Sequence, residues 1–81
     1  MFTIFRKRVG DRVFDRYYKK WDNAKDALEK EVEDMLSVDC KITKRLDRMN
    51  HEKGFYEYEV CLKTYLGEDA CLALIDGHFL D

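Results

Sequence analysis

The stretch that decides the fold is Trp21–Leu36, WDNAKDALEKEVEDML. Its apolar residues recur at helical spacing and make one stripe: Ala24, Leu28, Val32, Met35 and Leu36. Strong helix formers dominate the segment, and neither glycine nor proline interrupts it. We therefore expect one amphipathic helix over Trp21–Leu36, with Asp22 or Asn23 as its N-terminal cap.

The two segments that precede this helix have the period-2 alternation of strands. They are Phe2–Arg8 and Arg12–Tyr18, and the residues between them, Val9-Gly10-Asp11, are a turn signal. We expect the two strands to pair as a hairpin about Gly10.

Three more strands are expected after the helix. Lys41–Met49 has interleaved charges that suit an edge strand, and residues 50–54 form a loop ending in glycine. Phe55–Leu66 has the clearest alternation in the chain, and Gly67–Asp69 turns it. Ala70–Asp76 is apolar on both faces, so we expect a strand that either runs centrally in a sheet or is covered on both faces.

This order, ββαβββ, predicts an α+β fold with two layers, one amphipathic helix packed on a mostly antiparallel sheet. The 81 residues suffice for a single domain over 1–81, because a second core would need roughly 50 residues of its own. With 46% hydrophobic and 14% aromatic residues, the chain is too apolar for a disordered protein. No apolar run approaches the roughly 20 residues of a membrane-spanning helix, and the N-terminus lacks the charge order of a signal peptide. We expect a cytoplasmic protein.

The cysteines suggest a metal site as one alternative. Three cysteines without a CxxC pair are no disulfide framework, and they indicate a reducing compartment. Together with the histidines they supply enough thiols and imidazoles for four zinc ligands, and the candidates are Cys40, Cys61, Cys71 and His78.

The expected strand registers count against this zinc site. The expected hairpin turns place Cys40 and Cys71 opposite the same residue, Thr64, on either side of one strand. The two cysteines would then lie about 9 to 10 Å apart, too far for a tetrahedral thiolate pair. Cys61 would lie on the other face of the sheet. Our main expectation is therefore a protein without a cofactor.

A catalytic site is not apparent in the sequence, and we identify no catalytic residue. Ser37 is the only serine, and no cysteine is placed at a helix N-terminus that would lower its pKa. The four glycines are dispersed, whereas a phosphate loop needs a glycine run. We expect a protein that is not an enzyme.

Basic residues gather at the N-terminus and suggest a nucleic-acid interface as a further alternative. Residues 1–20 hold seven Lys and Arg against two Asp, interleaved with aromatic residues that would stack on bases. The candidate residues are Arg6, Arg8, Arg12, Arg16, Tyr17, Lys19 and Lys20. The net charge of −2 counts against this alternative, and so does strand alternation, which sends these bases to both faces.

The helix carries the opposite charge. Asp22, Asp26, Glu29 and Glu33 follow one another at spacings of four, three and four, which makes one acidic stripe. Such a stripe would occupy a basic groove on a partner as a phosphate backbone does. We take these four residues as the candidate partner-binding site.

In size and texture the chain resembles the short, motif-free, acidic α+β proteins that phages and mobile elements encode, among them the anti-CRISPR proteins. The resemblance covers the whole chain in style and carries no residue across. It implies a non-catalytic protein that binds a host protein in the host cytoplasm, often one that handles nucleic acid. We therefore expect an inhibitor of a host nucleic-acid-processing complex, as a monomer or, through an edge strand such as Lys41–Met49, as a dimer.

Overall fold

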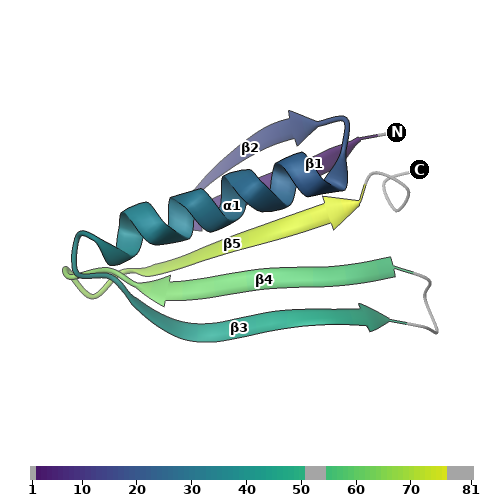
Figure 1. The fold of residues 1–81 in the computed structure, drawn as a ribbon. Helices are drawn as coiled ribbons and strands as arrows, with labels where there is room; N and C mark the ends of the chain where they lie inside the picture. The colour runs from purple at the N-terminus through teal and green to yellow at the C-terminus, as the bar shows by residue number, and fades with distance from the viewer. Residues whose placement is uncertain (1, 51–54, 77–81) are drawn as a thin grey trace.

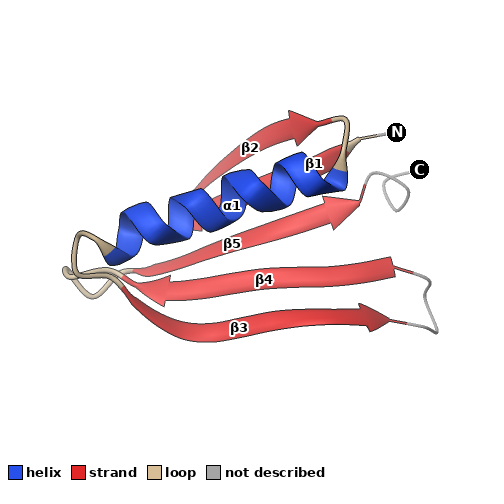
Figure 2. Cartoon of the chain, viewed as in Figure 1, coloured by secondary structure: helices blue, strands red, loops and turns tan. Residues whose placement is uncertain are grey.

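The computed structural model describes residues 2–50 and 55–76, which fold in the expected order ββαβββ (Figure 1). The elements are β1 (Thr3–Val9), β2 (Arg12–Tyr18), α1 (Trp21–Leu36), β3 (Lys41–Asn50), β4 (Phe55–Lys63) and β5 (Asp69–Asp76). The strands form one antiparallel sheet in the order β2-β1-β5-β4-β3, and α1 lies across one face of it (Figure 2). The two-layer α+β fold is confirmed.

The core lies between α1 and the near face of the sheet, by which we mean the face that α1 covers. The predicted helical stripe supplies one side of it, with Ala24, Leu28, Val32 and Met35 at most 8% exposed. The sheet supplies the other side through Phe5, Tyr58, Val60, Leu62, Ala70, Leu72 and Leu74. Leu36 departs from the prediction and is 44% exposed, because it points about 100° away from Met35 around the helix axis.

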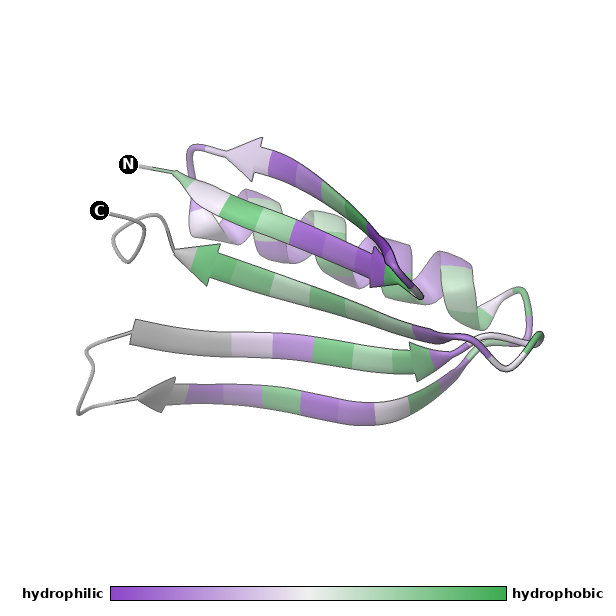
Figure 3. Cartoon of the chain, turned by 180° about the vertical axis from the view of Figure 1, so that it is seen from behind, coloured by the Kyte–Doolittle hydropathy of each residue, from purple (hydrophilic) through white to green (hydrophobic). Residues whose placement is uncertain are grey.

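The far face of the sheet is the side opposite α1, and Figure 3 is viewed from there. Its residues alternate along each strand with those of the near face. They include Ile4, Arg6 and Arg8 in β1, Asp15 and Tyr17 in β2, Lys44 and Leu46 in β3, Glu59, Cys61 and Lys63 in β4, and Cys71, Ala73 and Ile75 in β5.

β5 is the central strand, as its apolar sequence predicts. It pairs with β1 on one side and with β4 on the other. Figure 3 shows it as the most continuously hydrophobic strand of the sheet. In the edge strands β2 and β3, hydrophobic residues are interrupted by hydrophilic ones. On the near face its residues are buried under α1, and on the far face Cys71, Ala73 and Ile75 are half-buried beside the side chains of β1 and β4.

The helix begins differently from the expectation. Lys20 is the N-cap and makes no side-chain capping bond, so neither Asp22 nor Asn23 caps the helix. Both lie inside the helix, where the Asp22 carboxylate still complements the positive end of the helix dipole. Within the described residues, no helix combines the length and the apolar character needed to cross a membrane.

The first hairpin forms about Gly10, as predicted. Val9 pairs with Arg12, which leaves Gly10 and Asp11 as a two-residue turn. Gly10 has a φ of 58°, and a glycine with positive φ at the first turn position is typical of tight hairpins. Its backbone N–H donates to Asp69 O at 3.1 Å, which joins this turn to the start of β5.

The β4–β5 hairpin differs from the prediction by three residues. The expected strand extends to Leu66, but β4 ends at Lys63 and the Thr64 N–H donates to Glu68 O at 2.9 Å. A three-residue loop results, and its last residue, Gly67, has a φ of 85°. Loops of this length with a left-handed glycine are common in hairpins. An odd shift in register moves side chains to the other face, so the expected Thr64–Cys71 pair is wrong.

Candidate functional site

The acidic stripe of α1 has members in two different environments. Asp22, Asp26 and Glu33 are exposed, and none of the three forms an ion pair with a described residue. Glu29 instead accepts a hydrogen bond at 2.9 Å from Nη1 of Arg45 in β3. Among the residues that the structure describes, three carboxylates of the stripe are therefore unpaired, while the fourth links the helix to the sheet.

The last turn of α1 adds to this negative surface. Asp34 is exposed beside Glu33, and the last turn contains no basic residue. The C-terminal end of a helix has a partial negative charge, so carboxylates there cost about 0.3–1 kcal/mol each where basic residues would stabilise. Helix stability therefore does not account for the acids at this position.

The predicted nucleic-acid interface does not form one surface. Alternation places three of its seven residues on the far face of the sheet: Arg6, Arg8 and Tyr17. Arg12 and Arg16 lie on the near face, because their strand partners belong to the core side. Lys19 and Lys20 are exposed in the connection before α1.

Arg6 is already engaged within the sheet. Its guanidinium makes two hydrogen bonds to Asp15, from Nε to Oδ1 at 2.9 Å and from Nη2 to Oδ2 at 3.0 Å. The hydrogen bond raises the pKa of Arg6 and lowers the pKa of the Asp15 carboxyl. A planar two-point pair of this kind leaves Arg6 fewer donors for a phosphate.

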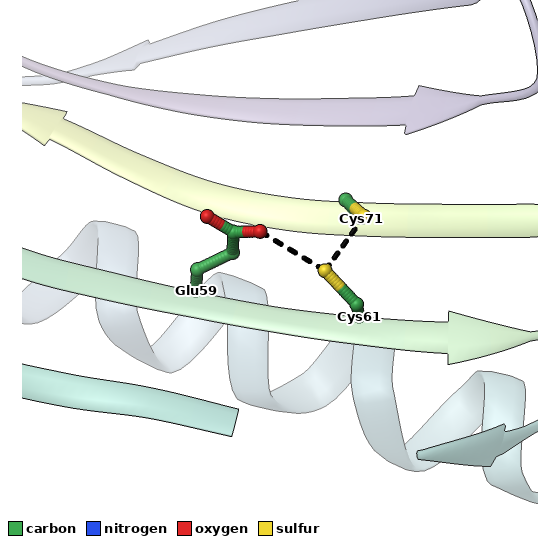
Figure 4. A group of neighbouring side chains, drawn as sticks. All are labelled: Glu59, Cys61 and Cys71. Atoms are coloured by element: carbon green, nitrogen blue, oxygen red, sulfur yellow. Dashed lines mark hydrogen bonds between the residues drawn. The ribbon is translucent and has the colours of Figure 1, made fainter. Parts of the chain in front are cut away.

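Two cysteines and a glutamate form a compact cluster on the far face (Figure 4). Cys61 in β4 lies directly opposite Cys71 in β5, and the Cys71 thiol donates to the Cys61 sulfur at 2.6 Å. The Cys61 thiol donates in turn to Oε1 of Glu59, two residues earlier in β4, at 3.0 Å. One potential ligand atom from each of the three residues lies within 4.8 Å of those of the other two.

The structure does not bring the four predicted zinc ligands together. Cys40 is buried in the core on the near side of the sheet, away from the other two cysteines, and His78 lies outside the described residues. Sequence reasoning separated Cys61 from Cys71 because it placed the last turn wrongly, and it missed Glu59. The signal for Glu59 is its i, i+2 spacing to Cys61, which puts both side chains on one face of a strand.

The surroundings of Cys61 favour its neutral thiol form. Burial raises the pKa of Cys61, and the hydrogen bonds with Cys71 and Glu59 raise it further. The flanking strands bring basic groups into the same row, with Lys44 opposite Cys61 and Arg8 opposite Cys71.

A hollow of about 400 Å³ lies beside β1 and β2, lined by Phe5, Lys7, Phe14, Asp15 and Arg16. Its charged groups already have partners. Lys7 donates a short hydrogen bond to Glu31, and Asp15 accepts the two bonds from Arg6. The guanidinium of Arg16 lies 5.4 Å from the centre of the Phe5 ring. The residues that line the hollow therefore offer no unengaged charged group for proton transfer.

Comparisons with protein-family models, with curated proteins and with solved structures give no match for this chain.

Proposed function

We propose that this chain is a non-catalytic protein-binding domain that presents the outer face of α1 to a basic surface of its partner. The observation that carries the proposal is a set of exposed carboxylates on that face that form no ion pair with a described residue: Asp22, Asp26, Glu33 and Asp34. Two of them stand in the last turn, where they oppose the helix dipole. Binding to a basic partner would explain why acidic residues stand at positions where they do not stabilise the helix.

The partner class follows from the charge and its spacing. Asp22, Asp26 and Glu33 follow one another at one and then two helical turns, which makes a line of negative charge along a rigid element, as successive phosphates do along a nucleic-acid strand. A groove that holds a phosphate backbone is lined with Lys and Arg and would attract such a line from a distance. An inhibitor of a nucleic-acid-processing complex in the host cytoplasm would act in this way, by occupying the groove.

The test compares two charge-reversed variants with the same change in net charge. In Asp26→Lys/Glu33→Lys the reversal lies on the outer face of α1, and in Asp11→Lys/Glu68→Lys it lies in the two hairpin turns. Each variant captures proteins from a nuclease-treated lysate, with and without added heparin as a polyanion. We expect the helix variant to lose the proteins that heparin displaces, while the turn variant keeps them. Equal capture by both folded variants would contradict the proposal.

Nucleic-acid binding by the far face is a second candidate, supported by one observation. Arg8 and Lys44 are exposed there without ion pairs to described residues, and Tyr17 on the same face is 66% exposed. Basic side chains beside an aromatic ring suit a single strand whose bases stack and whose phosphates are neutralised.

This candidate is tested by retardation of labelled single-stranded DNA and RNA at low salt. The variant Arg8→Ala/Lys44→Ala removes two bases of the far face, and Arg12→Ala/Arg16→Ala removes two of the near face. If the far face binds nucleic acid, Arg8→Ala/Lys44→Ala should lose retardation and Arg12→Ala/Arg16→Ala should keep it. Added salt should weaken the binding by the unmodified protein. Absence of retardation with the unmodified protein would eliminate this candidate.

A further inference from the structure

The far face of the sheet carries a cluster of potential metal ligands, separate from the acidic surface of α1. We propose that Glu59, Cys61 and Cys71 form a binding site for a thiophilic divalent cation, with Zn²⁺ as the expected metal. Two thiolates and one carboxylate are a donor set that favours zinc. Hard cations such as Mg²⁺ or Ca²⁺ bind oxygen ligands instead. The site lies on the opposite side of the sheet from α1, so it is independent of the proposed partner surface.

The backbone already fixes the positions from which the ligands extend. Cys61 and Cys71 are direct cross-strand partners. Glu59 lies on the same face, two residues before Cys61 in β4. In a tetrahedral site with Zn–S bonds of about 2.3 Å, the two sulfurs would lie about 3.8 Å apart. They lie 2.6 Å apart in this structure, so the change required is an outward rotation of the two cysteine side chains.

The cross-strand neighbour of Glu59 is small. The residue opposite Glu59 in β5 is Ala73, on the same face as the three ligand residues. Glu59 and Cys71 are partly exposed, so an ion has access from solvent. Three protein ligands leave one position of a tetrahedral site for solvent.

Charge balance supports a cation at this position. Binding of a divalent cation releases the two thiol protons, and the ion then faces two thiolates and one carboxylate. The complex has a net charge of −1, which the flanking bases Lys44 and Arg8 neutralise in part. The two bases therefore fit a site that becomes more negative when its ligands are deprotonated.

The experiment is a titration of the full chain with Co²⁺, which adopts the tetrahedral geometry of zinc and gives a thiolate charge-transfer band in the near ultraviolet. The protein is kept reduced with a phosphine, which leaves no competing small thiol. We expect a band that saturates at one cobalt per chain and disappears when Zn²⁺ is added. Cys61→Ser and Cys71→Ser should each abolish it at equimolar cobalt. Glu59→Gln should weaken binding at least about tenfold.

The matched control is the third cysteine. Cys40→Ala removes a thiol from the core side of the sheet and should leave both the band and its stoichiometry intact wherever circular dichroism shows the variant to be folded. A reduced wild-type protein that gives no band would overturn the proposal. So would a band that survives in Cys61→Ser and Cys71→Ser, or one that depends equally on Cys40.

Discussion

Arg45 in the edge strand β3 donates from Nη1 to Oε1 of Glu29 in α1 at 2.9 Å. The same nitrogen lies 3.3 Å from the hydroxyl of Tyr58, a core residue that is 4% exposed. The ammonium of Lys25 lies 5.2 Å from the centre of the same ring. Glu29 thus belongs to a polar connection between helix and sheet, unlike the rest of the acidic stripe.

Glu29→Gln and Glu33→Gln should therefore have opposite effects on stability. The first removes an exposed ion pair and should lower the free energy of unfolding by less than about 1 kcal/mol. The second removes a negative charge at the helix C-terminus and should raise it by about 0.3–1 kcal/mol. Urea unfolding measures both values, and added salt should shrink both differences. Equal effects of the two variants would show that Glu29 is as free as Glu33.

Alanine substitutions at Leu28 and Leu36 test which side of α1 faces the core. Leu28 is fully buried under the sheet, whereas Leu36 is 44% exposed. Leu28→Ala should lower the free energy of unfolding by about 2–5 kcal/mol, because it leaves a cavity between α1 and the strands. Leu36→Ala should change it by less than about 0.5 kcal/mol. Denaturant unfolding of the two variants checks this, and a large loss in Leu36→Ala would place the end of the helical stripe in the core after all.

Periodicity was sufficient to predict the elements of this fold. The spacing of Ala24, Leu28, Val32 and Met35 gave the helix and its buried side, and the apolar run at Ala70–Asp76 gave the central strand. These features depend on local pattern and on burial, which a sequence displays directly.

The candidate sites depend on strand register and on which residues the long side chains reach. Neither can be read directly from the sequence. The Cys61–Cys71 pair follows from a three-residue loop at Gly67 instead of a turn one or two residues later. The partner of Glu29 lies 16 residues away in an edge strand, and no spacing rule links it to Arg45. A small error in turn geometry is enough to move a whole strand to another pairing, so sites that span strands are the hardest to predict.

Asp15 should make stability depend on pH on the acid side. The hydrogen bond from Arg6 lowers the pKa of the Asp15 carboxyl, so the folded protein favours the ionised form. Its contribution is fully present above the unfolded pKa of about 3.9 and is lost as the pH falls through the lower folded value. Asp15→Asn should therefore be less stable than the wild type at neutral pH, and the difference should vanish in acid. Thermal unfolding over this pH range measures it.

The comparison variant for this prediction is Asp11→Asn. Asp11 is exposed in the first turn and forms no ion pair with a described residue. Its substitution should leave the pH dependence of the wild type unchanged. A stability difference for Asp15→Asn that persists at the lowest pH would mean that the asparagine disturbs the hairpin for a reason other than charge.

Gly67 determines the register that brings Cys61 and Cys71 together, so its substitution should act on the whole β4–β5 hairpin. Its φ of 85° lies in the left-handed region, although no atom stands within 4 Å of a Cβ built there. Gly67→Ala should therefore lower the free energy of unfolding by about 1–2 kcal/mol through backbone strain alone. Gly67→Asn should cost less, because asparagine tolerates this conformation. Urea unfolding gives the energies, and amide exchange at the Thr64 N–H, which donates to Glu68 O, reports whether the hairpin opens. An alanine variant as stable as the wild type would mean that the loop does not require a left-handed residue at this position.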